Sequence, residues 1–533
     1  MVENKKTKLV GDYKVAAEDY ALRKVPRTWR WSWFYTINSG LGIGTALFYP
    51  TYGAILAATF GLTTALIGLW LISIPLQLLI GYTVIARTSR YHIDTDMVSR
   101  SAGFGFVGSV IATVVYALTF LYYFGYEGDI MASGISAYTH INVGIVYIVL
   151  FFAFIPLILW GMRLMTAFQS YTLPIWLAFI AFLSYEAFFN PHYAANILPQ
   201  ISTYPKLSGL LLVGFMSTML GIVPGASIDV GDYSRFAKNG KSRAGVFLTA
   251  LLPNNLFAWA IGTLGIFIGA AFLQSNAGIY AVSVMGLLGM LFVILSQLRI
   301  NITNVYSASL AFANFFSRVG RILPGRWVLA IASLIIGTIL EFSNVVAHTV
   351  LFSTFLGIFV AGWVGSLIAN LAINKRFFSP GVYEYRRPYL PAFSTPGFVS
   401  TVLAFIIGLS MYITGLVTNN AVLFAWSSVT SFGIAIILAI IIGYVRRNEK
   451  FFIRPTIQYP GEPGVVPCPN CKVPSETTDL FPCPFLKKYI CSNCCMRVRD
   501  CGEICKKMPD SELLSIPKLV DDKDYIIKGA DTD

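Results

Sequence analysis

Residues 221–236 read GIVPGASIDVGDYSRF and end an apolar run that begins at Leu210. A helix that crosses a membrane should be interrupted here, because Pro224 removes a hydrogen-bond donor and the neighbouring glycines loosen the backbone. Irregular backbone at membrane depth persists only where it lines a cavity or is buried in protein. An acid at that depth, here Asp229, is costly and usually serves a function. The stretch therefore predicts a broken membrane helix beside a binding site.

A second interruption, Asn38–Gly44 (NSGLGIG), falls inside the first apolar run of the chain. Two interrupted spans in separate halves of a polytopic chain are typical of the central site of a secondary transporter. On this interpretation Asn38, Gly40 and Gly225 belong to a substrate site. The simpler alternative is a kinked helix that binds no ligand, since Gly and Pro are frequent in membrane helices.

The composition excludes an ordinary soluble protein. Of 533 residues, 56% are hydrophobic and 12% are charged, whereas soluble domains carry about 25% charged residues. The net charge is +13, but the basic residues fall in short loops and form no patch of the kind that binds nucleic acid. We therefore expect an all-α integral protein of the cell membrane, in contact with the lipid bilayer.

Twelve segments are apolar enough to cross the bilayer, which takes about 20 residues each. Their ranges are 32–58, 62–86, 106–136, 143–161, 167–189, 208–228, 245–273, 279–316, 327–340, 344–372, 397–417 and 423–445. Basic residues gather in alternate loops: Arg87, Arg90 and Arg100; Arg163; Arg235, Lys238, Lys241 and Arg243; Arg318, Arg321 and Arg326; Lys375, Arg376, Arg386 and Arg387. By the positive-inside rule, this alternation predicts an even number of spans with both termini in the cytoplasm.

The composition changes after Tyr444, and the chain divides accordingly. The sequence predicts a cytoplasmic N-terminal segment (1–30), a transmembrane domain (31–445), a linker (446–467), a Cys-rich module (468–510) and a polar tail (511–533). All eight cysteines lie between positions 468 and 505.

The cysteines predict a metal-stapled module. Cys468-Pro-Asn-Cys471 and Cys491-Ser-Asn-Cys494 are two pairs separated by 19 residues, a spacing that fits a four-thiolate zinc site. Cytoplasmic thiols stay reduced, which favours metal over disulfides. The other four, Cys483, Cys495, Cys501 and Cys505, are expected to form a second site that holds zinc or an iron–sulfur cluster. The module would serve regulation of transport, metal sensing or docking of a cytoplasmic protein partner.

Three stretches carry a family signature: Asp232-Tyr-Ser-Arg-Phe-Ala-Lys after the sixth span, Gln297-Leu-Arg-Ile-Asn-Ile-Thr-Asn-Val-Tyr-Ser-Ala-Ser-Leu in the eighth, and Tyr123-Phe-Gly-Tyr-Glu127 in the third. They resemble the nucleobase:cation symporter-1 family, in its cytosine/purine permease branch. The resemblance covers about residues 25–445 and leaves out the Cys-rich tail. It implies a LeuT-like fold of twelve helices. In that fold two inverted repeats of five helices place broken helices 1 and 6 around a substrate between helices 1, 3, 6 and 8. It also implies symport of a nucleobase or related heterocycle with H⁺ or Na⁺.

The resemblance also implies roles for single residues. Tyr123 stands where the family has a stacking Trp, and Glu127 where a Gln reads the edge of the ring. Asn304 matches the family's edge-reading Asn, and Asn301 could do that job equally well. A carboxamide suits the edge of a lactam because it donates and accepts hydrogen bonds at once.

The chain departs from the family at three positions. Val223 replaces a second stacking Trp, Asp229 replaces an Asn, and Arg299 falls where a hydroxyl holds Na⁺. A guanidinium there would repel Na⁺, which favours proton coupling through Glu127 or Asp229. Alternatively, Arg299 pairs with one of these two acids as a structural ion pair.

Asp232 and Arg235, three residues apart at the cytoplasmic end of the sixth span, can pair on a helix and are interpreted as a gate or loop anchor. No arrangement of nucleophile and base is visible, so an enzyme is not predicted. The sequence thus predicts a permease for a nucleobase-like heterocycle. The alternatives are a membrane sensor that signals through the metal module and a transporter of an amino acid or other small metabolite.

Overall fold

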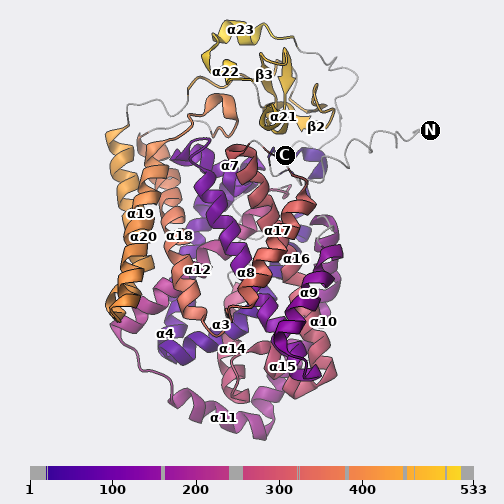
Figure 1. Ribbon diagram of the computed structural model, residues 1–533, viewed down its shortest axis with the longest axis vertical. Helices are drawn as coiled ribbons and strands as arrows, with labels where there is room; N and C mark the ends of the chain where they lie inside the picture. The colour runs from indigo at the N-terminus through magenta and orange to yellow at the C-terminus, as the bar shows by residue number, and fades with distance from the viewer. Residues whose placement is uncertain are drawn as a thin grey trace, which may run out of the picture.

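The structure is a computed structural model that describes residue 20 and residues 22–157, 162–238, 256–320, 322, 324–378, 383–447, 453–460, 463–498 and 501–517. Parts of the expected N-terminal segment, seventh span, linker and polar tail lie outside these residues. Figure 1 shows a long helical bundle with the small Cys-rich module at one end.

The first half of the bundle contains η2 (Arg27–Trp29), α2 (Trp33–Gly44), α3 (Phe48–Phe60), α4 (Leu62–Leu66), η3 (Ile67–Ile72), α5 (Ser73–Ile80), η4 (Gly81–Ile85), α6 (Ala86–Tyr91), α7 (Thr95–Ser99), η5 (Arg100–Phe104), α8 (Val110–Thr139), α9 (Val143–Leu157), α10 (Met162–Phe189) and α11 (Pro191–Ser202). The second half contains α12 (Gly209–Ser234), α14 (Ala258–Phe272), α15 (Ala277–Met285), α16 (Leu287–Val319), α17 (Arg326–Glu341), α18 (Thr349–Ile368), η8 (Ala369–Phe378), η9 (Arg387–Tyr389), α19 (Thr395–Val417) and α20 (Ala421–Val445).

The helices fall on the predicted spans. The described part of the chain has eight helices long and apolar enough to cross a membrane, or up to ten if each of two bent pairs counts as one span. Two shorter apolar helices, α9 and α17, lie on the fourth and ninth predicted spans. Every predicted span therefore carries an apolar helix.

The break in the first span lies just after the predicted one, between α2 and α3, which meet at 40°. Helix α16 satisfies the backbone groups that the break exposes. The Gln297 Oε1 accepts from the N–H of Leu47 at 3.3 Å, and the Ser296 hydroxyl donates to the carbonyl of Thr45 at 3.2 Å. Irregular backbone is thus stabilised inside the protein, as membrane depth requires.

The predicted break in the sixth span is wrong, because α12 runs unbroken from Gly209 to Ser234 with Pro224 inside it. Its glycines serve close packing instead. A Cβ at Gly221 would lie 2.0 Å from the carbonyl oxygen of Ser353, and one at Gly225 would lie 2.7 Å from the Thr119 side chain.

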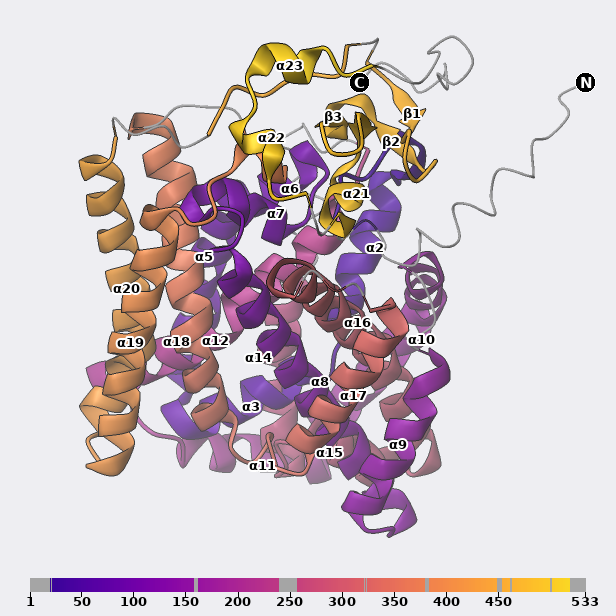
Figure 2. The same cartoon turned by 45° about the horizontal axis from the view of Figure 1, so that its top comes forward.

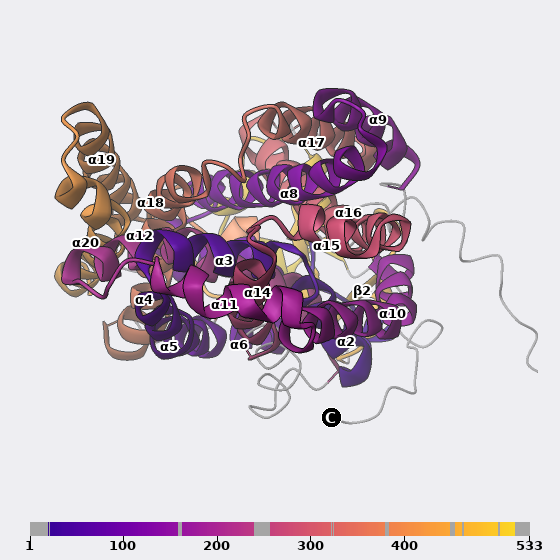
Figure 3. The same ribbon diagram turned by 90° about the horizontal axis from the view of Figure 1, so that it is seen from below.

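Seen from the end opposite the module, α3 lies between α8 and α14 (Figure 3).

In its described residues, the module has two antiparallel two-stranded sheets, three short α-helices and one 3-10 turn. They are β1 (Val465–Pro467), β2 (Pro474–Glu476), η10 (Thr477–Asp479), β3 (Phe481–Cys483), β4 (Lys488–Ile490), α21 (Ser492–Arg497), α22 (Ile504–Lys507) and α23 (Asp510–Leu514). The module sits close over α6 and α7, as Figure 2 shows. Tyr389 of the membrane domain belongs to its apolar core, together with Ile457 and Tyr459 of the expected linker.

Candidate functional site

A cavity with about 310 Å³ of empty space lies at the break of the first span, between α3, α8, α12 and α16. The space open to a water-sized molecule is only about 20 Å³, so the cavity is nearly closed in this conformation. It is lined by Ile43, Ala46, Phe48, Tyr49, Tyr123, Glu127, Ile222, Ala226, Asp229, Ile300 and Asn304. The residues are mostly apolar, with a few polar groups that converge from three helices. The cavity therefore has the character of a ligand site.

Glu127 is the acid most firmly held in this cavity and is 2% exposed. The Gln297 amide donates to its carboxylate at 2.5 Å and to its backbone carbonyl at 2.9 Å. The backbone N–H of Phe48, the first residue of α3, also donates to it. The carboxylate therefore bridges the break in helix 1 to α16, with the positive end of the α3 dipole beside it.

Aromatic side chains form one wall of the cavity. The Tyr123 hydroxyl donates to the carbonyl of Ile222 at 2.9 Å and so ties α8 to α12. Phe48 stacks on Tyr52, with ring centroids 4.8 Å apart and planes at 18°. Phe48 and Tyr49 line the cavity but were not predicted as site residues. Their position directly after the interruption of the first span is the signal that could have identified them.

Asn304 brings an unsatisfied amide into the cavity. Its Nδ2 donates to the Asn301 Oδ1 at 3.2 Å. The Oδ1 of Asn304 and the Nδ2 of Asn301 are buried and have no partner among the described residues. Because a buried polar atom without a partner costs free energy, the Asn304 Oδ1 is suited to a ligand that donates a hydrogen bond.

Asp229 is the second acid of the cavity, on the α12 side. Ser307 lies 3.4 Å from its Oδ1. Within the described residues, no base forms an ion pair with Glu127 or with Asp229. Both acids therefore remain available to a proton or to a ligand.

Arg299 lies outside the cavity lining, at the contact of α16 with α10. One of its nitrogens donates to the Thr172 hydroxyl at 3.0 Å, while Nε and Nη2 have no partner among the described residues. The alternative that Arg299 pairs with Glu127 or Asp229 is therefore wrong. The Gln169 amide donates to the carbonyl of Arg299 and, at 3.1 Å, to the Thr303 hydroxyl.

The remaining expected substrate residues are buried or packed near the cavity but do not line it. They are Asn38 and Gly40 in α2, Val223 and Gly225 in α12, and Asn301 in α16. A Cβ at Gly225 would lie 2.8 Å from the Tyr123 hydroxyl, so this glycine lets the aromatic wall reach α12.

Asp232 and Arg235 belong to a polar region nearer the module. The Tyr116 hydroxyl donates to the Asp232 carboxylate at 2.6 Å. Arg235 donates to the backbone carbonyl of Asp232 at 3.1 Å and lies 3.9 Å from the carboxylate of Asp94. The two predicted residues therefore help to connect α12 with α8 and with the segment before α7.

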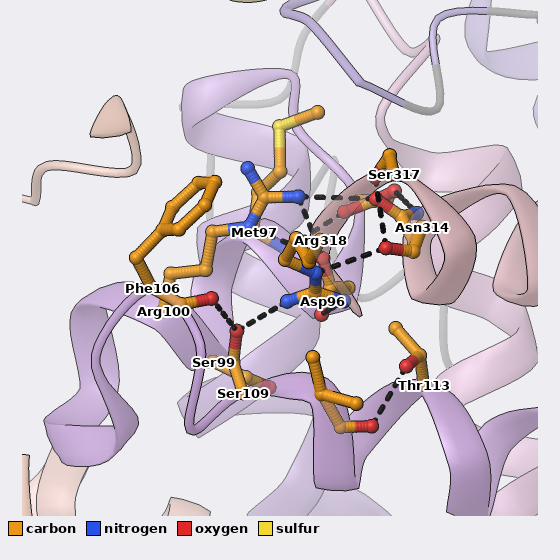
Figure 4. A network of polar contacts seen from close by, with 12 residues as sticks. Asp96, Met97, Ser99, Arg100, Phe106, Ser109, Thr113, Asn314, Ser317 and Arg318 are labelled. Carbon is orange, nitrogen blue, oxygen red and sulfur yellow. Dashed lines mark hydrogen bonds and ion pairs between the residues drawn. The ribbon is translucent and has the colours of Figure 1, made fainter. Parts of the chain in front are cut away.

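Next to them lies the inner network, formed by Asp94, Asp96, Arg100, Asn314 and Arg318 (Figure 4). Asp96 accepts from Arg100 at 2.9 Å and from Arg318 at 2.8 Å. Asn314 donates to Asp94 at 3.1 Å and accepts from Arg100 at 3.0 Å. The sequence analysis did not name this network as a site.

Asp94 caps the short helix α7 and accepts from the N–H of Met97 at 2.8 Å. It lies in a loop between membrane spans. Burial and the nearby carboxylate of Asp96 raise the pKa of Asp94 to about 7, against the attraction of Arg235 and Arg100. This group therefore changes its charge near neutral pH.

The first cysteine quartet has the geometry of a metal site. The Sγ atoms of Cys468, Cys471, Cys491 and Cys494 all lie within 4.8 Å of one another. Two of the pairs, Cys468–Cys494 and Cys471–Cys491, are 3.8 Å apart. A tetrahedral zinc ion with Zn–S bonds of about 2.3 Å needs sulfur atoms about 3.8 Å apart. These four residues therefore fit zinc.

The fold is similar to that of solved membrane transporters. Mhp1, a nucleobase-cation-symport-1 family transporter in a closed conformation with bromovinylhydantoin bound, matches at 15% identity over 81% of this chain and 96% of its own, with a TM-score of 0.54. Mhp1 in its inward-facing conformation matches at 16% identity over 81% and 94%, with a TM-score of 0.53. A Na⁺-coupled sialic acid symporter, substrate-bound and outward-open, matches at 14% identity over 84% and 96%, with a TM-score of 0.55.

No family model and no curated protein matches the sequence. The structural matches show the fold, which is the LeuT-like fold of these transporters, and the apolar helices fit a multi-pass membrane protein. The predicted fold is thus confirmed, apart from the break in helix 6.

Proposed function

We propose that this protein is a secondary transporter that imports a nucleobase or a related planar heterocycle through the central cavity by alternating access. The observation that carries the proposal is the buried Oδ1 of Asn304, which lines the cavity and has no partner among the described residues. The edge of a lactam presents an N–H donor that would satisfy this oxygen. Phe48 and Tyr123 supply apolar ring faces of the kind on which a flat heterocycle packs.

Proton coupling through Glu127 is favoured over sodium coupling. Glu127 is buried, faces the cavity and forms no ion pair with a described base, so it can carry a proton together with the substrate. Arg299 places a guanidinium where α16 meets α10 and where Gln169 lies against Gly42 of α2. A fixed positive charge at this junction opposes the binding of Na⁺.

Uptake of labelled cytosine, uracil and adenine into proteoliposomes tests the proposal. Accumulation should follow an imposed pH gradient, inside alkaline, and should be equal in sodium and choline buffers. Accumulation that requires sodium would contradict proton coupling. If none of these heterocycles binds or accumulates, while an amino acid does, the substrate class is wrong.

A membrane sensor is the second candidate, and the docked module favours it. Glu476 of the module binds Lys24 at 2.6 Å and also binds Arg30, and both bases lie just before the broken first span. A change at the ligand site can therefore reach the module through this segment. Binding of a heterocycle without accumulation in the same vesicles would favour the sensor.

The module is proposed to hold zinc at Cys468, Cys471, Cys491 and Cys494 and to lie in the cytoplasm with both termini. The docking of the module onto the segment that begins at residue 22 places both ends of the described chain at one end of the bundle. Protease added outside intact cells should leave the module uncut and should cut it only after the cells are permeabilised.

A further inference from the structure

A second pocket in the module collects the other four cysteines. Cys483 at the end of β3, Cys495 in α21, Cys501, and Cys505 in α22 all line it, around about 320 Å³ of empty space. Pro388 of η9, from the membrane domain, closes one side. All four cysteines are free of disulfides. Four thiols from separate short elements thus face one space at the contact between module and membrane domain.

The same contact carries a basic residue that suits a negatively charged metal centre. Arg387 of η9 donates two hydrogen bonds to the Glu503 carboxylate, at 2.8 and 3.1 Å, and Glu503 lies between Cys501 and Cys505 in the chain. Arg387 also interacts electrostatically with Cys495 and Cys501. A zinc ion with four thiolates carries a net charge of about −2, and Arg387 and Lys506, which both pair with Glu503, leave one net positive charge beside it.

The elements that carry these cysteines are too small to hold their positions alone. Strand β3 has three residues, α21 has six and α22 has four. Modules of this size generally depend on a metal or disulfides for their fold. Among the described residues only the first quartet gathers its sulfur atoms within 4.8 Å, so bound metal would have to draw the second quartet together by side-chain rotation.

We propose that Cys483, Cys495, Cys501 and Cys505 bind a second zinc ion, and that this ion fixes the Cys501–Cys505 segment against η9 and so docks the module onto the membrane domain. The two metals then have different neighbours. The first lies in the part of the module that holds Lys24 and Arg30 through Glu476, and the second lies beside the loop before α19. The proposal does not depend on the identity of the transported substrate.

Metal analysis of the purified full-length protein in detergent tests the proposal. The wild type should contain two zinc ions per chain. The double variant Cys483→Ser/Cys501→Ser should retain one, and so should the matched control Cys468→Ser/Cys491→Ser. One zinc ion in the wild type, unchanged in the first variant, would overturn the second site, and iron in that site would overturn the choice of zinc.

A titration of the metal-free wild type with Co²⁺ keeps the test valid if a variant fails to fold. The thiolate-to-cobalt absorption should rise until two equivalents are bound; saturation at one equivalent would refute the second site.

Hydrogen exchange of residues 383–391 tests the docking role. Exchange there should increase several-fold in Cys483→Ser/Cys501→Ser compared with the wild type, and unchanged exchange would contradict the role of the metal in docking. These measurements need no transport, so their failure leaves the proposed function untouched.

Discussion

The central cavity and the inner network are two buried polar regions that share helix α16, but their polar groups are paired very differently: the cavity lies between α3, α8, α12 and α16, and the inner network joins α7 and η5 to α16. In the inner network both carboxylate oxygens of Asp96 meet a guanidinium, and Asn314 uses both ends of its amide. In the cavity, the Oδ1 of Asn304 is buried without a partner among the described residues, and so is the Nδ2 of Asn301 just outside the lining.

This difference distinguishes a candidate binding site from a region that stabilises the packing of the helices. Buried polar groups that are fully paired stabilise one arrangement of the helices, whereas unpaired ones leave free energy to be gained from a ligand. Asp94, Asp96 and Asn314 of the inner network line a small pocket of their own, together with Tyr116 and Asp232, that shares no residue with the cavity. Variants in each region should therefore fail in different ways.

The largest effect is expected from Glu127→Gln. The amide can still accept the hydrogen bond from Phe48 but cannot carry a proton, so accumulation driven by a pH gradient should be lost while binding of the heterocycle persists. Proteoliposome uptake and equilibrium binding measure the two quantities separately. The matched control is Glu186→Gln, because Glu186 lies on α10 and bonds to Asn190 away from the cavity. Normal pH-driven accumulation in Glu127→Gln would exclude this residue as the proton carrier.

The next effect should come from Asp96→Asn in the inner network. This change leaves Arg100 and Arg318 without their shared anion, and removing one partner of a buried ion pair costs about 3–5 kcal/mol. The thermal unfolding temperature in detergent should fall by several degrees. The control is Asp510→Asn. The Asp510 carboxylate pairs with Arg454 but is exposed, so its loss should change the free energy of unfolding by about 1 kcal/mol or less. Equal losses in both variants would show that the network is no stronger than a surface pair.

The sequence predicts the positions of the membrane spans well because each span is determined by local features of the chain. The length of each apolar run and the basic loops place the spans without any tertiary contact. The prediction of a break in the sixth span is wrong because glycines near Pro224 also allow helices to pack closely. The sequence alone does not distinguish a closely packed helix from a broken one. The inner network stays hidden for another reason. It joins Asp96 to Arg318, two charges more than 200 residues apart whose meeting depends on the whole fold.

A smaller effect is expected from Asn304→Ala in the cavity. The change removes the amide that should read the edge of the substrate, at a cost of about 1–3 kcal/mol, which corresponds to an affinity about 5- to 150-fold weaker. Competition binding with a panel of nucleobases measures it. In the control Asn370→Ala, the lost amide bonds only within the α18–η8 region, so affinity should stay within about twofold. Unchanged affinity in Asn304→Ala would remove this residue from the substrate site.

The smallest effect concerns pH and Asp94. Its pKa of about 7 in the folded protein lies above the value of about 3.9 in an unfolded chain, so the folded state binds the proton more tightly. As pH rises from about 4 to about 7, the unfolded state loses this proton first, and the contribution of Asp94 to stability declines. In Asp94→Asn this decline is absent, because an amide does not titrate, while Asn still caps α7. The unfolding temperature of the variant relative to the wild type should therefore increase between pH 5 and pH 7 and level off above about pH 8. A difference that is constant across this range would mean that Asp94 stays ionised beside Arg235 and Arg100, and the inner network would then be insensitive to neutral pH.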